Sequence, residues 1–541
     1  MYECPSCGAG LEFNPKTQKL DCKYCKSSFD PKDLEEKLKD AKGDKGFSVE
    51  NSKDENGNEK VDVYEAVVYR CTQCGAELIT TDETIATFCS YCGSSAILEK
   101  KNQKKVAPNY VIPFTKSKEE CEQAYKNKLK KAFFAPSDML KTQQVEKIRG
   151  IYMPYWVYSF DKDGEQSNTG SRYSHRVGDY VYYDDYTIKT NIKASCEGVS
   201  HDAAANFADN LSEAIAPFSM KEKKDFSPTY LSGYYADSQD VNGEVYREEC
   251  NKIANEQAAK ELKKDSTFAR YGCTPKVDMN PKDAKIGLFP VYFLATRNKK
   301  GDRISYAVVN GQTGKVAAEI PIDFKKYLIV SLILAVALFF LFNGFLTLTP
   351  TKIIIISIIF NVISLVISNS QMNKVIAREK MIDDKGNASK NAKENAAGNT
   401  SKAKKDNNNN QANLVAGIVV FFILLGIVVS YSALGKGSIA LPIAGGIIFA
   451  GLISALNIHK KNQHKAKFSE KAPKLVKPFI GLIIAIVIFI WSPVSDVYYY
   501  GGAIISILMT IWSFSDLIKE INLLTTRKLP QLGRRGGDEN A

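Results

Sequence analysis

The chain has 541 residues, too many for one hydrophobic core, so we expect several domains. The net charge of +12 suggests nucleic-acid binding, but much of the excess lies in loops between apolar runs and in the tail, which weakens that inference. The first residues, "MYECPSCGAG", lack the basic and apolar regions of a signal peptide, so this segment is expected in the cytoplasm with reduced thiols.

Eight of the twelve cysteines form two copies of the pattern C-x2-C-x14-C-x2-C, the second 67 residues after the first. The predicted metal ligands are Cys4, Cys7, Cys22 and Cys25 in one copy and Cys71, Cys74, Cys89 and Cys92 in the other. Two close pairs of thiolates suit tetrahedral Zn²⁺, so the sequence predicts two β zinc ribbons, over 1–30 and 61–100, with one structural zinc ion each. Disulfides, a redox Cys-x-x-Cys pair and an iron–sulfur site are the alternatives. A closed four-cysteine site leaves no coordination position for a substrate, so no catalysis is expected from the metal.

The residues around the cysteines agree with this interpretation. Gly8, Gly75 and Gly93 follow cysteines at positions where a turn lets backbone amides approach the sulfurs. "LEFNPKTQKLDC" and "AELITTDETIATFC" each predict a strand, a turn and a strand. Such ribbons contact nucleic acid, RNA polymerase or other proteins. Neither copy has a dense stripe of arginines with aromatics, so protein contact is favoured and nucleic acid is disfavoured.

Between and after the ribbons the composition changes. The charged segment 31–60 predicts a short helix followed by a flexible linker. Residues 106–324 mix helical patterns, such as "SKEECEQAYKNKLKKAF" and "EECNKIANEQAAKELKKD", with aromatic-rich strands, which predicts a cytoplasmic α+β domain. "RGIYMPYWVYSFDKDGE" is similar to "IGLFPVYFLATRNKKGD", each with an early proline, Pro154 or Pro290. Either a duplication with prolines on edge strands or coincidence explains the similarity.

This middle region contains no recognisable catalytic set. Its only histidines are His175 and His201, and it has no phosphate-binding loop or nucleophile motif. Asp184 and Asp185 are adjacent, so on a strand they would point to opposite faces, and a solvated turn is the favoured interpretation. The isolated cysteines, which are expected to be ordinary thiols, are Cys121, Cys196, Cys250 and Cys273. The protein is therefore predicted not to be an enzyme.

Long apolar runs dominate the remainder of the chain. Six of them approach the length of a membrane-spanning helix: about 327–348, 353–370, 413–432, 437–457, 478–495 and 499–515. Basic residues concentrate in alternate loops and in the tail, so the positive-inside rule predicts a multi-pass cell-membrane protein with both termini in the cytoplasm. The predicted segments are transmembrane helices 1–2 (327–370), a disordered basic linker (371–412), transmembrane helices 3–6 (413–519) and a basic cytoplasmic tail (520–541).

The fold class predicted from these patterns is multidomain: two small β zinc ribbons, an α+β domain and an all-α bundle of about six transmembrane helices. The 371–412 linker is expected either to contact anionic membrane lipid or to be a solvated spacer. No run holds an internal charged residue, and the polar exceptions Asn343 and Asn361 are explained by bonds between helices. The runs therefore suit an anchor better than a transport path.

Several stretches resemble a bacterial family of membrane-anchored, transcription-factor-IIB-type zinc-ribbon proteins, often labelled as related to a primosomal helicase. The similar features are the cysteine quartets, "NYVIPFTKSKEE", "FFAPSDM", "GIYMPYWVYSFD", "FSPTYLSGYYAD" and "NGQTGKVAAEIP". The resemblance covers roughly residues 1–345. It implies partnership with envelope-stress systems, in which such proteins bring phage-shock-type (PspA-like) and flotillin-like (SPFH) proteins to the membrane.

The leading functional hypothesis is a non-enzymatic membrane scaffold whose ribbons and α+β domain recruit soluble protein partners. The alternatives are a membrane-tethered protein that binds nucleic acid or RNA polymerase, and a transporter or channel with a cytoplasmic zinc-ribbon regulatory head. The sequence leaves the partner and the oligomeric state open.

Overall fold

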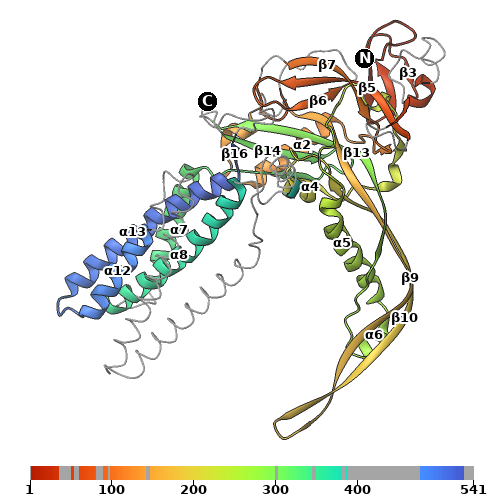
Figure 1. Ribbon diagram of the computed structural model, residues 1–541. Helices are drawn as coiled ribbons and strands as arrows, with labels where there is room; N and C mark the ends of the chain where they lie inside the picture. Colours follow the sequence, from red (N-terminus) through yellow and green to blue (C-terminus); the bar gives the residue numbers. More distant parts are fainter. Residues whose placement is uncertain are drawn as a thin grey trace, which may run out of the picture. The chain divides into compact units, whose positions relative to one another are not determined.

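The structure is a computed structural model that falls into two compact units (Figure 1). Unit 1 is Met1–Ile320, Met381–Asn399 and Thr526–Ala541, and unit 2 is Pro321–Lys380 and Thr400–Thr525. The residues that the structure describes are 2–35, 50–53, 60–80, 89–94, 98–141, 147–298, 303–343, 349–379, 385–386 and 476–528. Two predicted apolar runs, 413–432 and 437–457, lie outside these ranges. So does the predicted linker 371–412, apart from 371–379 and 385–386.

The first ribbon is a three-stranded antiparallel sheet in the order β1-β2-β3. Its strands are β1 (Leu11–Asn14), β2 (Lys19–Cys22) and β3 (Ser28–Phe29). Alternation places Leu11, Phe13 and Leu20 on the buried face, as the strand–turn–strand prediction required. That face packs into the core of unit 1, because the Phe13 ring contacts Tyr230 at 5.4 Å and the Phe13 N–H donates to the Ser232 carbonyl.

Thirteen strands form one mixed sheet in unit 1, with β11-β8-β13-β9-β12-β6-β5-β4 as its main path. β10 pairs with β9, β7 with β5, and β14 with β13, β15 and β16. The strands are β4 (Glu50–Lys53), β5 (Lys60–Cys71), β6 (Glu77–Thr80), β7 (Leu98–Val106), β8 (Tyr110–Val111), β9 (Arg149–Val177), β10 (Tyr180–Asp202), β11 (Lys224–Asp225), β12 (Tyr235–Ala236), β13 (Asn280–Arg297), β14 (Arg303–Asn310), β15 (Val316–Ala318) and β16 (Arg527–Lys528).

In the described part of unit 1, the helices that cover or flank this sheet include α2 (Lys118–Lys131), α4 (Asp209–Ile215), α5 (Glu244–Leu262) and α6 (Ser266–Arg270). Short 3₁₀ turns occur at η1 (Ser137–Leu140), η2 (Met220–Glu222) and η3 (Pro228–Leu231). α2 begins with a capping box between Ser117 and Glu120, and it buries Cys121, Tyr125 and Leu129 on one face, as its sequence period predicts.

β9 and β10 make a long hairpin that reaches beyond the rest of the sheet (Figure 1). β10 pairs with β9 from Tyr155 to Val177, whereas β13 follows the other side of β9 only as far as Asp161, so the hairpin extends past β13. α5 packs along the hairpin, with Tyr246 and Cys250 buried against Tyr158. Asp184 and Asp185 lie exposed on β10, within the strand rather than on a turn.

The two similar strand segments found in the sequence, in β9 and β13, are direct antiparallel neighbours. Neither Pro154 nor Pro290 lies on an edge strand. Instead, each proline lies at a junction where its strand changes partner on one side. β9 pairs with β12 before Pro154 and with β10 after it, and β13 pairs with β8 before Pro290 and with β14 after it. A residue without an N–H group is tolerated at such a junction because neither neighbouring strand there needs its hydrogen bond.

Unit 2 is helical in its described part: α7 (Phe324–Asn343), α8 (Pro350–Glu379), α12 (Val476–Trp491) and α13 (Asp496–Leu524). Ile354, Ala485 and Ala503 form a small buried core between α8, α12 and α13. A polar seam joins α8 to α13: Asn361 Nδ2 donates to Ser506 Oγ at 2.8 Å, and the hydroxyls of Ser364 and Ser513 lie 2.9 Å apart. The expected bond between helices at Asn361 is therefore present.

The predicted fold class is wrong in two respects. The second ribbon is not a separate small domain, because its strands β5 and β6 belong to the thirteen-stranded sheet. The expected all-α bundle of about six transmembrane helices is also wrong. In the part of the chain that the structure describes, two helices are long and apolar enough to cross a membrane by length and composition, with qualifying windows at Pro350–Ile367 and Asp496–Leu524.

The same finding overturns the multi-pass cell-membrane location and the cytoplasmic placement of both termini that depended on it. The physical reason lies in what an apolar run measures. An apolar run gives only the hydrophobicity of a stretch of sequence, whereas a spanning helix also needs about 20 residues of continuous helix. The run expected at 478–495, for example, contributes a helical apolar stretch of only Phe479–Trp491.

Candidate metal centres

Each cysteine quartet is built from two tight turns with the same backbone pattern. In each turn the first cysteine makes two backbone hydrogen bonds. Its carbonyl accepts from the N–H of the residue four positions later, and its own N–H donates to the carbonyl of the residue five positions later. The residue four after the first cysteine has positive φ in all four turns: Gly8 (74°), Lys26 (63°), Gly75 (75°) and Gly93 (64°). Glycine adopts this conformation without strain, which explains three of the four residues. Lys26 carries no sequence signal that marks it for this backbone conformation.

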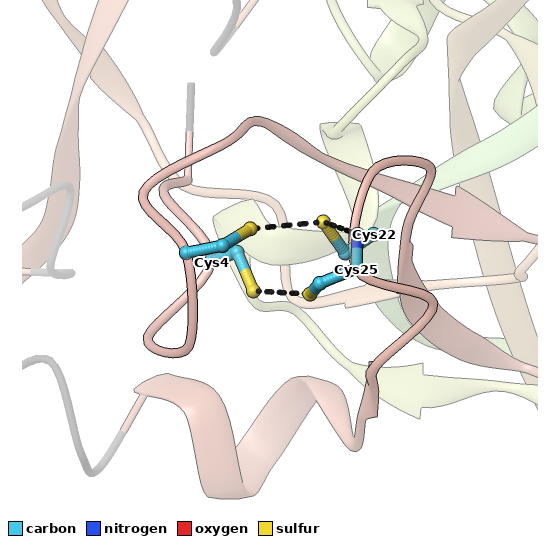
Figure 2. A group of neighbouring side chains, drawn as sticks. Cys4, Cys22 and Cys25 are labelled. Atoms are coloured by element: carbon cyan, nitrogen blue, oxygen red, sulfur yellow. Dashed lines mark hydrogen bonds between the residues drawn. The ribbon is translucent and has the colours of Figure 1, made fainter.

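The first cluster brings its four sulfurs together, pointing toward one another, as Figure 2 shows for Cys4, Cys22 and Cys25. Cys4 Sγ lies 3.5 Å from Cys25 Sγ, and Cys7 Sγ lies 3.6 Å from Cys22 Sγ. Cys4 and Cys22 are buried, whereas Cys7 and Cys25 are exposed. The outer turns of this cluster therefore face solvent.

The second cluster has the same geometry and a different environment. Cys71 Sγ lies 3.8 Å from Cys92 Sγ, Cys74 Sγ lies 3.7 Å from Cys89 Sγ, and all four side chains are buried in the main core of the sheet. Two residues of neighbouring strands hold its outer turn. Arg297 Nε donates to the Cys92 carbonyl at 2.6 Å, and the Tyr306 hydroxyl donates to the Tyr91 carbonyl at 3.0 Å.

The pKa values of the thiols differ within each cluster. Hydrogen bonds with Ser27 lower the pKa of Cys25 to about 6. A hydrogen bond with Cys89 lowers the pKa of Cys71 to about 6, and hydrogen bonds with Cys74 and Cys89 lower that of Cys92 to about 2. Each cluster thus contains thiols that ionise readily, and the thiolate is the form that binds a metal ion.

The sulfur positions fit a bound metal and exclude disulfides. A disulfide requires about 2.05 Å between sulfurs, whereas the paired sulfurs here lie 3.5 to 3.8 Å apart. Four sulfurs placed tetrahedrally about 2.3 Å from one ion are about 3.8 Å apart. Both quartets could hold a metal ion, as their sequence spacing predicts.

Tyr24 and Tyr91 occupy the same position of the repeat, in "CKYC" and "CSYC". The side chain of Tyr91 is 1% exposed, packs on Phe293 and hydrogen-bonds through its hydroxyl to Asp237. Burial raises the pKa of Tyr91 well above its ordinary value, so the phenol remains the donor. Tyr24 is 83% exposed. Sequence reasoning missed this contrast, because the residues that receive Tyr91 are distant along the chain.

The fold and the two clusters define a protein with two four-cysteine metal-site candidates in one compact unit, one on a three-stranded ribbon and one on the thirteen-stranded mixed sheet. No family model matches the chain, and no solved structure matches it. The chain is similar to YdjG, an uncharacterized protein of Bacillus subtilis (strain 168), with 29% identity over 334 residues. The match covers 60% of this chain and 91% of that protein, so most of the relative has a counterpart here.

Proposed function

We propose that the protein is a non-enzymatic binding scaffold in which zinc fills both clusters and the first ribbon receives a soluble protein partner. Zinc is the natural choice for closed sets of four thiolates, and it leaves no coordination position for a substrate. The resemblance to membrane-anchored zinc-ribbon proteins suggests PspA-like and SPFH proteins as the first partners to test.

One observation carries the proposal: the repeat buries one tyrosine and exposes the other. Tyr91 shows what this turn does when it is engaged, since its ring enters an aromatic pocket and its hydroxyl reaches the carboxylate of Asp237. Tyr24 presents the same side chain on the same turn to solvent. We infer a partner with a comparable pocket, lined by apolar side chains and containing an acceptor such as a carboxylate.

The surroundings of Tyr24 suit an acidic partner. Lys23 and Lys26 are exposed on either side of it, and Lys23 forms an exposed ion pair with Glu12 at 2.7 Å. Exposed charges of this kind contribute little affinity, but they steer association with a surface of opposite charge. The ribbon itself is held rigidly, since Gln18 Nε2 donates to the Phe114 carbonyl at 2.8 Å. A rigid ribbon that presents Tyr24 in a fixed position loses little conformational entropy when it binds a partner.

The experiment replaces Tyr24 in the full chain with the photo-crosslinking amino acid p-benzoylphenylalanine, in the cells that make the protein. We expect a covalent adduct with one soluble protein, mapped by mass spectrometry to a site that contains Asp or Glu. The matched control carries the same substitution at Tyr180, which is 76% exposed on the hairpin. Equal yields of the same adducts at both positions would contradict the proposal.

Affinity provides the second measurement. Truncating a central interface tyrosine typically costs about 2 kcal/mol, roughly thirtyfold in Kd. Tyr24→Ala should weaken capture of the identified partner by that amount, and Tyr180→Ala should leave it unchanged. An unchanged Kd for Tyr24→Ala would show that the first ribbon is not the binding element.

The exposed lysines beside an exposed aromatic ring also favour a second candidate function, nucleic-acid binding. The same crosslinking experiment separates the two. Adducts at position 24 that disappear on nuclease treatment would support nucleic acid, whereas adducts that survive it and yield peptides support a protein partner.

A further inference from the structure

Where β10 ends and α4 begins, unit 1 contains a group of potential ligands that sequence reasoning left without a role. His201, Asp202 and Asp209 each offer a ligand atom within 4.8 Å of the others. Their side chains come from the last two residues of β10 and the first residue of α4, brought together by the intervening loop 203–208. Glu213, also on α4, adds a carboxylate whose Oε1 lies 3.6 Å from His201 Nε2.

The two innermost members are buried without hydrogen bonds. His201 is 4% exposed and Asp202 is 1% exposed. Both ring nitrogens of His201 and both carboxylate oxygens of Asp202 are inaccessible to solvent and lack a hydrogen-bond partner. His201 Nδ1 does lie 3.1 Å from Asp202 Oδ1, as an ion pair if the ring is protonated. Placing a carboxylate so deep without hydrogen bonds is costly unless a cation balances it.

Other contacts fix the shape of this group. The imidazole of His201 stacks on Tyr246 with 3.6 Å between ring centroids, which holds the ring plane. The Tyr246 hydroxyl donates to Asp209 Oδ1 at 2.6 Å, and the Lys385 N–H donates to Asp209 Oδ2 at 2.8 Å. Each carboxylate oxygen has two lone pairs, so these bonds orient Asp209 and leave it able to bind an ion.

From this arrangement we propose a third metal site, in which His201, Asp202 and Asp209 bind one divalent cation. One ring nitrogen of His201 binds the ion, and the other donates to a neighbouring carboxylate, the arrangement that commonly orients histidine at metal sites. Either ring nitrogen has a carboxylate to which it can donate, since Nδ1 faces Asp202 and Nε2 faces Glu213.

The donor atoms indicate which ions fit. Imidazole and carboxylate ligands suit Zn²⁺ and Mn²⁺, whereas the four-thiolate clusters select softer ions such as Zn²⁺ and take Mn²⁺ poorly. The third site is thus distinguishable from the ribbons by its chemistry. The site lies apart from the first ribbon and does not depend on the proposed partner binding.

The test uses the full reduced chain loaded with only two equivalents of Zn²⁺, which the eight thiolates of the cysteine clusters take up. Mn²⁺ alone is then titrated and followed by electron paramagnetic resonance, in which free Mn²⁺ gives a signal that is lost on binding. We expect one bound Mn²⁺ per chain, with pulsed measurements showing coupling to one imidazole nitrogen. No bound Mn²⁺, or bound Mn²⁺ without nitrogen coupling, would overturn the proposal whatever the variants do.

Variants then assign the ligands. Asp202→Asn keeps the shape of the side chain and removes its charge, and it should weaken Mn²⁺ binding at least tenfold. Asp184→Asn removes an exposed carboxylate elsewhere on β10 and should leave binding unchanged. Equal Mn²⁺ affinity of Asp202→Asn and the parent chain would place the ion elsewhere. In that case a protonated His201 would be the cation that balances Asp202.

Discussion

The residue four positions after the first cysteine of each turn has positive φ, and it is glycine in three turns and Lys26 in the fourth. A residue with a Cβ atom in this conformation costs roughly 1–2 kcal/mol. The three glycines could be recognised from the sequence because glycine after a metal-binding pair has a known role. Lys26 could not, since a lysine carries no local signal for a left-handed backbone.

This difference predicts opposite effects of two substitutions in the first ribbon. Gly8→Ala introduces a Cβ that meets no atom within 4 Å, so its cost is conformational alone. We expect about 1–2 kcal/mol and a zinc affinity lower by roughly tenfold. Lys26→Gly relieves the same strain and should bind zinc at least as tightly as the parent chain. Chelator competition on the full chain measures both, and a loss of affinity in Lys26→Gly would contradict the backbone explanation.

The eight ligand cysteines were predictable because spacing alone groups them. The different environments of Tyr24 and Tyr91 were not, because "CKYC" and "CSYC" are nearly identical. Only folding brings Asp237 and Tyr306 to the second copy. His201 was similarly obscure, since its partners Asp209 and Glu213 lie on the next helix and its burial depends on Tyr246.

At the scale of elements, the short strand β16 was not foreseen. The segment containing Arg527 and Lys528 reads as a basic tail, yet it pairs with β14 opposite Arg303 and Ile304. Arg527 donates to Glu319 at 3.1 Å, and both side chains are largely buried, at 17% and 6% exposure. Two residues of a tail seen in the sequence only as charge thus belong to the sheet, through a partner strand more than 200 residues away.

Removal of Arg527 should therefore destabilise unit 1. Arg527→Ala leaves the buried Glu319 without this cation, and breaking a buried pair typically costs about 3–5 kcal/mol. We expect a lower thermal unfolding midpoint by scanning fluorimetry, and little change for Lys528→Ala, whose side chain is exposed. Adding Glu319→Gln to Arg527→Ala removes the buried charge and should recover part of the loss. No recovery would mean that the ion pair is not the stabilising contact.

Several elements were predictable in kind but not in extent. The helices at 118–131 and 244–262 follow patterns visible in the sequence. The strands of β9 and β10 were recognised in pieces, because each is far longer than an ordinary strand and its outer part exposes both faces. Alternation of half-buried and exposed residues continues through 163–170 and 186–197 but ends near the exposed tip, so the pieces could not be recognised as continuous strands.

At the scale of the whole molecule, the sequence separated a charged first part from an apolar second part, and the two compact units divide near the same point, at Ile320. It failed to show that both cysteine clusters join one unit. The reason is the register of β5, which extends the second ribbon into a strand of the large sheet. Counting spans failed because an apolar run does not have to form one continuous helix of spanning length, as the stretch Phe479–Trp491 illustrates.

The central claim is that both quartets are closed metal sites, and X-ray absorption at the zinc edge tests it most directly. The full chain, purified under reducing conditions and loaded with two equivalents of Zn²⁺, should show four sulfur neighbours per zinc at about 2.3 Å and no other first neighbours. A shell of nitrogen or oxygen neighbours at about 2.0–2.1 Å in most of the zinc would contradict the claim. So would cysteines that oxidise to disulfides in preference to binding the ion.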